Sequence, residues 1–556
     1  MSSLVRSALF GLLLSAGPLL AAPVPLPAKY DPPTAVGQVA SVQAVLDTVM
    51  GYVRAFSPET ADQMQTGLAA QLGEKGWAGV DLKKPVGMFT YLKPKLEDSY
   101  IVFVVPIGKE KDALELLERL GVGAEEEPKA KGVYRLRVRG LLPEVTPTRM
   151  RFHDGHAYIG LNADADELDV TKLLPVGSLI DESEKAPAAA TFYPARAPKE
   201  LKELFDGWWA SGKASLDQLE NNPPRDMPRN FPAFGKAALG WLDGNSAALF
   251  KDGESVRVRL TPDPKTTDSK IELVVTPKAK SPLAADIEKL TPTPGRFHQL
   301  VTKDAVGGLW LTVGPNFPKE VREKGGPFVA DLIGMLVPGA PEEVQPVLTA
   351  VSDGLSKAVA DGKADAGVAL LGPDKNDAHT LIGAVAMADP SGLEKAVRKA
   401  VKDAPKEVQE MFKLDAEKAG EMAVHTFTIP EGAEWLEKVI GKKGVVRLAF
   451  GKDAVYFAAG PDGLEQIKRA AALKATDGKR FDIVTNPKKL NKLIADLGGG
   501  GGGPGFNPLD MFVGKEDGLR SFFGIDAKGG KELTVTYTQH RMGLMFGWFA
   551  LRVGGL

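Results

Sequence analysis

Hydrophobic residues recur at strand and helix spacing along most of the chain. Apolar residues at helical spacing predict one helix at residues 41–56, and Pro58 separates it from a second helix at 59–72. The pattern that follows predicts strand, strand, helix, strand, strand and helix, at residues 87–92, 100–106, 113–120, 133–139, 149–161 and 165–174. The predicted fold class is therefore α+β.

The same pattern returns in the second half of the chain. Residues 89–120 match within the stretch 368–401 without a gap at an offset of 279 residues, as in Leu114 and Leu393. A second block, at an offset of 298 residues, pairs Arg149 with Arg447. We therefore predict two diverged ββαββα repeat units with flanking helices. The aromatic pairs within the second block are expected in the two cores; they are Phe152 with Phe450 and Tyr158 with Tyr456.

Strand patterns outside the two copies predict an antiparallel sheet that joins and closes them. These strands lie at residues 255–260, 270–275 and 308–313, and two more are predicted near the C-terminus. The expected division is a signal peptide at 1–22, a proline-rich leader at 23–35, repeat unit A at 36–190, a connecting segment and antiparallel sheet at 191–340, repeat unit B at 341–475, and closing strands with a glycine-rich loop at 476–556.

The first residues have the pattern of an export signal. Arg6 precedes a short apolar run at residues 8–20 that ends in small residues, which predicts cleavage after Ala21 or Ala22. The run is too short to span a bilayer, and we expect no later membrane helix. The chain has no cysteine, which excludes disulfides and thiolate metal sites. Its net charge of −2 gives no electrostatic reason to expect nucleic acid.

The sequence motifs that are typical of enzymes are incomplete in this chain. The glycines at 367–372 have phosphate-loop spacing, but Pro373 and Asp374 stand where lysine and a hydroxyl residue are required. The glycine run at 498–503 follows a predicted helix, so it does not fit a dinucleotide loop. Asn162, Asp164 and Asp166 resemble the start of a calcium loop without its glycine and its final glutamate. We therefore predict no catalytic, cofactor-binding or metal-binding residue.

Two histidine positions receive structural interpretations. The sequence His153-Asp154-Gly155-His156 is interpreted as a hairpin turn rather than a metal pair. His425 shares a strand face with Phe427 and is interpreted as a core histidine.

Four pairs of side chains are identified as helix capping boxes, in which two side chains satisfy the first amides of a helix. They are Asp112 with Glu115, Asp164 with Glu167, Ser391 with Glu394, and Asp462 with Glu465.

Five arginines form the candidate functional feature. Alternation places them together on the outward face of two adjacent strands of repeat unit A, where unit B has other residues at most positions. They are Arg135, Arg137, Arg139, Arg149 and Arg151. One interpretation is an anion-binding surface for an envelope polymer or a lipid head group. The alternative is a solvated face whose arginines pair with neighbouring carboxylates.

The export signal, the AGVDLKKPVG segment at residues 78–87 and the duplicated unit resemble exported bacterial proteins of the planctomycete kind. The resemblance implies export and carries no activity, substrate or cofactor.

The sequence as a whole predicts an exported, non-enzymatic binding or structural protein of the periplasm or cell envelope. Two alternatives stay open. One is a carrier that holds an apolar ligand between helices and sheet, and the other is a hydrolase whose site converges from distant segments.

Overall fold

The structure is a computed structural model of the 556-residue chain. It describes residues 29–138, 147–224, 227–263, 268–290, 294–315, 317–335, 345–428, 439–441, 444–477, 480–497 and 517–539. The predicted signal peptide, the start of the leader, the glycine run and the last predicted strand lie outside these residues.

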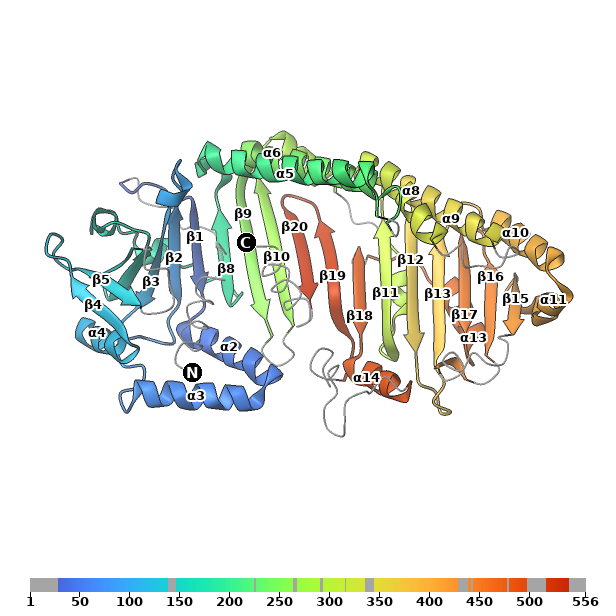
Figure 1. The fold of residues 1–556 in the computed structure, drawn as a ribbon, viewed down its shortest axis with the longest axis horizontal. Helices are drawn as coiled ribbons and strands as arrows, with labels where there is room; N and C mark the ends of the chain where they lie inside the picture. The colour runs from blue at the N-terminus through green and yellow to red at the C-terminus, as the bar shows by residue number, and fades with distance from the viewer. Residues whose placement is uncertain are drawn as a thin grey trace. The chain divides into compact units, whose positions relative to one another are not determined.

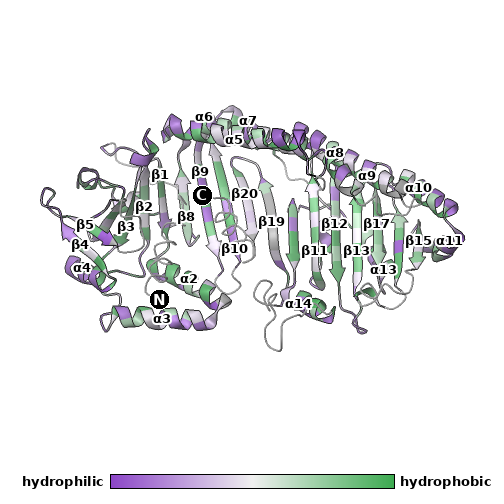
Figure 2. Cartoon of the chain, in the orientation of Figure 1, coloured by the Kyte–Doolittle hydropathy of each residue, from purple (hydrophilic) through white to green (hydrophobic). Residues whose placement is uncertain are grey.

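The chain forms two compact units, and both are α+β (Figure 1). Unit 1 comprises Met1–Asp206, Ser246–Glu288 and Gly529–Tyr537. Unit 2 comprises Gly207–Asn245, Lys289–Lys528 and Thr538–Leu556. Hydrophobic and polar residues alternate along the strands of both units, as Figure 2 shows.

Unit 1 is built on an antiparallel sheet. Its strands follow the order β10-β9-β8-β1-β2-β3-β7-β6-β5-β4. Their bounds are β1 Ala35–Val39, β2 Val86–Tyr91, β3 Tyr100–Pro106, β4 Val122–Glu126, β5 Val133–Val138, β6 Thr148–His153, β7 His156–Leu161, β8 Ala188–Phe192, β9 Gly253–Pro262 and β10 Ser269–Pro277. A further strand, β20 (Leu533–Gln539), pairs with β10.

The main core of unit 1 lies between this sheet and the segment that follows β7. Tyr158 on β7 is 1% exposed, and its hydroxyl donates a hydrogen bond to the Leu174 carbonyl at 2.9 Å. Burial raises the pKa of Tyr158 to about 12. Among the described residues, the α-helices that lie wholly within this unit are α2 (Val42–Phe56), α3 (Pro58–Leu72), α4 (Glu110–Arg119) and α7 (Pro282–Glu288).

Unit 2 is also built on an antiparallel sheet. Its strands follow the order β19-β18-β11-β12-β13-β17-β16-β15-β14. Their bounds are β11 Ala305–Val313, β12 Ala364–Leu371, β13 Thr380–Ala386, β14 Phe412–Ala419, β15 Met422–Thr428, β16 Val445–Phe450, β17 Ala454–Ala459, β18 Phe481–Thr485 and β19 Arg520–Lys528.

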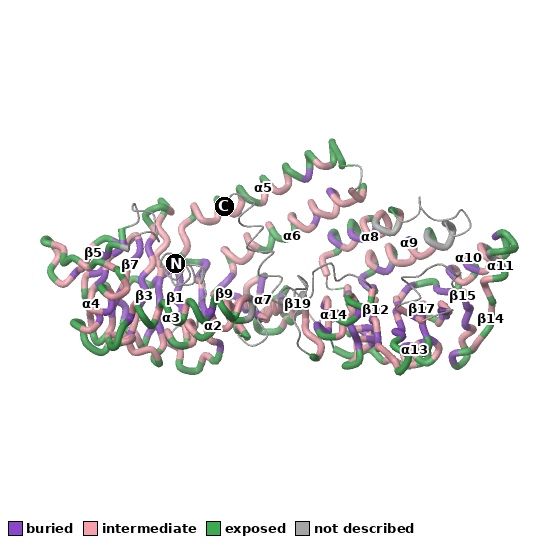
Figure 3. Tube along the Cα trace, turned by 60° about the horizontal axis from the view of Figure 1, so that its bottom comes forward, coloured by how far each residue is buried: buried purple, intermediate pink, exposed green. Residues whose placement is uncertain are grey.

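Helices cover parts of the unit 2 sheet. Helices α8 (Lys319–Gly334), α9 (Gln345–Ala360) and α10 (Pro390–Asp403) run along one end of its strands, and α13 (Gly463–Ala471) and α14 (Pro487–Asp496) lie toward the other (Figure 1). Buried residues gather along the strands (Figure 3), and Tyr456 on β17 is 3% exposed.

Two long helices, α5 (Lys199–Asn221) and α6 (Phe231–Asp252), contribute residues to both units. Within unit 2 they are joined by ion pairs of Lys213 with Asp243 at 2.7 Å and of Lys236 with Asp217 at 2.5 Å.

Several predicted elements agree with the structure. Helices α2 and α3 lie on the two predicted helices, separated at Ser57, and the Tyr158 and Tyr456 side chains are buried as predicted. Phe450 is also buried, whereas Phe152 is only partly buried.

The strands predicted between the two copies form, and each pairs antiparallel with its neighbours. Strands β9 and β10 extend the unit 1 sheet through β8, and β11 pairs with β12 and β18 inside unit 2. Hydrophobic alternation identifies a strand, but cross-strand packing decides which sheet it joins. The predicted strand at 149–161 is a hairpin of β6 and β7, turned at Asp154 and Gly155 with positive φ angles.

Of the four predicted capping boxes, only that of Asp164 and Glu167 forms. Helix α4 begins two residues before Asp112, and α10 is capped by Asp389, so Ser391 lies in its first turn. Asp462 occupies the N-cap of α13 without a side-chain hydrogen bond.

Candidate functional site

Three arginines of the predicted face, Arg135, Arg137 and Arg149, form ion pairs. Arg137 forms an ion pair with Glu125 at 2.9 Å, and Arg135 lies 3.5 Å from Glu127, with both arginine side chains more than half exposed. Arg139 lies outside the described residues. The charges of these two strands are therefore partly neutralised within the protein.

Arg149 and Arg151 point into the fold. The Arg149 side chain is 13% exposed; it donates to Glu127 at 2.8 Å and to the Ala163 carbonyl at 2.7 Å. Arg151 donates to the carbonyls of Leu168 and Lys131. The predicted outward position is wrong for Arg149, because its partly buried guanidinium bridges the end of β4 to the segment after β7.

The same contact occurs in unit 2. Arg447 donates to Glu417 at 2.7 Å and to the Gly460 carbonyl at 3.2 Å. Arg447 thus makes in unit 2 the two kinds of contact that Arg149 makes in unit 1, one with a glutamate and one with a backbone carbonyl.

The His153–His156 turn is a hairpin turn as predicted. His156 Nδ1 lies 2.7 Å from the Asp154 carbonyl oxygen. His156 also lines a cavity of about 700 Å³ in unit 1, whose other lining residues are Lys84, Pro85, Val176, Gly177, Ile180, Asp181, Glu182 and Ser183. The Ser183 hydroxyl donates to Asp181 at 2.5 Å, and so does the Ser183 amide. These contacts form an Asx turn and differ from a catalytic triad, in which histidine receives the serine proton and the carboxylate orients the histidine.

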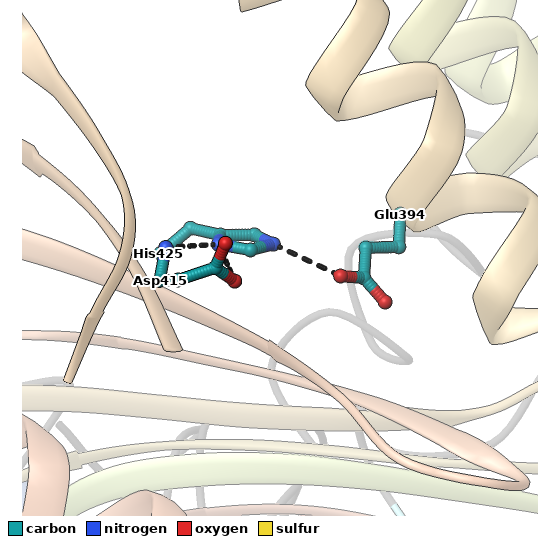
Figure 4. Close-up of side chains that lie close together, drawn as sticks. All are labelled: Glu394, Asp415 and His425. Atoms are coloured by element: carbon teal, nitrogen blue, oxygen red, sulfur yellow. Dashed lines mark hydrogen bonds and ion pairs between the residues drawn. The ribbon is translucent and has the colours of Figure 1, made fainter. Parts of the chain in front are cut away.

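A second cluster surrounds His425 in unit 2 (Figure 4). Helix α10 starts at the Asp389 cap, whose carboxylate accepts the Gly392 amide at 2.8 Å, and Pro390 occupies its first turn. Because Glu394 and Arg398 are four residues apart, they lie on one face of this helix. Strand β14 has a register shift between Lys413 and Glu417 opposite β15, and this irregularity contains Asp415 at φ 55°.

The His425 imidazole is held in one tautomer. His425 is 2% exposed, and its Nδ1 accepts the Asp415 backbone amide at 3.0 Å. An acceptor nitrogen carries no hydrogen, so the proton of the neutral ring is on Nε2. Nε2 lies 3.4 Å from Glu394 Oε1 and forms no hydrogen bond to the described residues. The ring also contacts Phe450, with centroids 5.6 Å apart.

Arg398 links the two carboxylates of this cluster. Its Nη2 lies 2.7 Å from Glu394 Oε1 and 2.5 Å from Asp415 Oδ1. These hydrogen bonds raise the pKa of Arg398, and the Arg398 partner lowers the pKa of Asp415. Burial, and then the nearby Arg398 charge, lower the pKa of His425 from its ordinary value of 6.5.

Three potential metal donors meet in this cluster. One atom each from Glu394, Asp415 and His425 lies within 4.8 Å of the others. The Arg398 guanidinium already occupies both carboxylates, and a backbone amide occupies His425 Nδ1. The resident cation of this cluster is therefore the guanidinium, and the residues present do not favour a divalent ion.

Sequence reasoning recognised only one member of the cluster by its environment. His425 was expected in the core, and it is buried. Glu394 was assigned to a capping box, and Arg398 and Asp415 were missed. The spacing of Glu394 and Arg398 was a readable signal, whereas the position of Asp415 depends on an irregularity of β14.

The unit 2 sheet also carries an apolar face. Leu309 and Leu311 on β11 are 42% and 37% exposed, although β11 lies inside the sheet between β12 and β18. Trp310 between them points to the opposite face and is buried. The cross-strand neighbours of the two leucines are apolar, and they are Val368, Ala366, Ile483 and Phe481.

The chain matches no protein-family model, and the searches found no similar curated protein or solved structure. Among the residues that the structure describes, no helix combines the length and the apolar character required to cross a membrane.

Proposed function

We propose that this chain is an exported, non-enzymatic binding or structural protein of the periplasm or cell envelope. Its first residues support export, because a positive residue, a short apolar run and small residues follow one another there. The contacts around His425 and Ser183 support a role without catalysis, because both side chains are engaged in holding local structure.

The proposal includes two diverged copies of one unit. Nine strands follow the same order in both sheets, β9-β8-β1-β2-β3-β7-β6-β5-β4 in unit 1 and β19-β18-β11-β12-β13-β17-β16-β15-β14 in unit 2. The gap-free sequence matches and the shared contacts of Arg149 and Arg447 support the same interpretation.

The apolar face around Leu309 and Leu311 favours the carrier form of this function. The solvated face of an antiparallel sheet is normally polar, so two exposed leucines on an interior strand indicate contact with an apolar partner. The backbone of β11 is paired on both sides, which leaves no free edge for an added peptide strand. Recognition at this face therefore depends on apolar side chains, and an acyl chain is the ligand class that fits.

Native mass spectrometry of protein purified from its own cell envelope tests this proposal. We expect a mature chain that begins at Ala22 or Pro23 and carries an apolar ligand that organic solvent removes. The double variant Leu309→Asn, Leu311→Asn should lose the ligand. Leu242→Asn, at a leucine that is 40% exposed on α6, should retain it as the matched control.

A retained Met1 in the envelope fraction would contradict export. A wild-type protein without bound ligand, or a double variant that binds as much as the control, would contradict the carrier form.

A further inference from the structure

We propose that His425 is a proton-operated latch that connects the edge strand β14 to β15 and α10. The latch makes the stability of unit 2 depend on acid, independently of ligand binding. The Asp415 amide sets the tautomer of the imidazole by donating to Nδ1.

A second proton on His425 has only one place to go. Nε2 already carries the hydrogen of the neutral ring, so protonation must occur at Nδ1. The Asp415 amide hydrogen points at that atom. Two hydrogens cannot share this position, and the 3.0 Å bond between the amide and the ring must break when the imidazolium forms.

Asp415, whose amide contact is lost, also offers its carboxylate to the imidazolium. Asp415 Oδ1 lies 3.6 Å from His425 Nδ1, and Glu394 Oε1 lies 3.4 Å from Nε2. Both carboxylates are bound to Arg398 in the neutral state. Protonation thus replaces the hydrogen bond from the Asp415 amide with an ion pair to the Asp415 carboxylate. The imidazolium then competes with Arg398 for the carboxylates of Asp415 and Glu394.

The groups that act on the imidazole come from three elements. Helix α10 supplies Glu394 and Arg398, β14 supplies Asp415, and β16 faces the ring with the apolar side chains of Leu448 and Phe450. Two further charged residues of β14 lie opposite Thr426 and Val424 and so occupy the other face of the sheet; they are Lys413 and Glu417.

The position of Asp415 gives this exchange a structural consequence. The residue lies at a positive φ in the irregular part of β14, and within the described residues β14 pairs with β15 alone. A strand with one partner and a broken register has few hydrogen bonds to hold it, so loss of the Asp415 amide contact loosens the edge of the sheet.

Burial lowers the pKa of His425, so the folded state resists protonation. Below the ordinary histidine value of 6.5 the unfolded or locally opened chain binds a proton that the closed state does not. The closed state therefore loses stability as the pH falls through this window, until the folded pKa is reached.

Hydrogen exchange of the full chain, measured from pH 7.5 to pH 5, tests the latch. The protection factors of the β14 amides should fall by up to about tenfold per pH unit below the ordinary pKa of histidine. In His425→Asn the Oδ1 atom replaces Nδ1 as acceptor without titrating, and protection should not depend on pH. His379→Asn is the matched control, because His379 is 4% exposed in the same unit and its pKa is also lowered by burial; this variant should keep the wild-type response.

A wild-type profile without pH dependence at β14, or a response that persists in His425→Asn, overturns the proposal. A second readout does not require a substituted protein. The imidazole signal of His425 in selectively labelled wild-type protein should titrate below 6.5, and titration at or above that value would also overturn the latch.

Discussion

At the residue scale, the arginines of repeat unit A differ in what they contact, although the sequence presents them as one set. Arg149 has a side chain that is 13% exposed and bridges Glu127 to the Ala163 carbonyl. Arg137 and its partner Glu125 are both more than 60% exposed. A half-buried ion pair leaves an unsatisfied charge when one partner is removed, whereas an exposed pair is replaced by water.

We therefore expect Arg149→Gln to lower the free energy of unfolding of unit 1 by about 1–3 kcal/mol. The matched change Arg137→Gln should lower the same free energy of unfolding by less than about 0.5 kcal/mol. Thermal unfolding at moderate ionic strength measures both. Equal losses in the two variants would show that the Glu127 contact contributes no more than a surface pair.

At the element scale, the start of α10 determines where Glu394 and Arg398 point. The Asp389 carboxylate accepts the Gly392 amide at 2.8 Å, whereas Asp462 occupies the same position on α13 without such a bond. The N-cap of α10 therefore forms a side-chain hydrogen bond, whereas the N-cap of α13 does not, so α13 provides a control for α10.

Replacing Asp389 with alanine should lower the melting temperature of unit 2 by about 2–4 °C at pH 7. Asp462→Ala should change it by less than about 1 °C, because no side-chain bond is lost.

The Asp389 effect should also depend on pH. The backbone bond from Gly392 lowers the pKa of Asp389, so its contribution is present above the ordinary value of 3.8 and is lost as the pH falls through the folded pKa. If the melting temperatures of wild type and Asp389→Ala still differ once the Asp389 carboxylate is fully protonated, the capping role is contradicted.

At the scale of the whole molecule, each unit has a core of its own. Tyr158 and Phe89 lie in the core of unit 1, and Tyr456 and Ile382 lie in that of unit 2. Separate cores usually unfold as separate cooperative units.

Calorimetry should accordingly resolve two transitions. Arg149→Gln should lower one of them, and Gly383→Ala should lower the other, because a Cβ at Gly383 would lie 2.2 Å from the Phe457 ring. A single transition that both variants shift equally would show that the two cores unfold together.

The local structure of this protein follows from signals in its amino-acid sequence. Helices α2 and α3, strands β2, β3 and β5 and the burial of Tyr158 and Tyr456 follow from hydrophobic spacing and from Pro58, and these signals act over a few residues. The strands that β9, β10 and β11 pair with, and the partners of the arginines and of His425, follow from the tertiary structure. Those choices depend on packing and hydrogen bonding between segments distant in the chain, and the positive φ of Asp415 that completes the His425 cluster arises from the irregular pairing of β14 with β15.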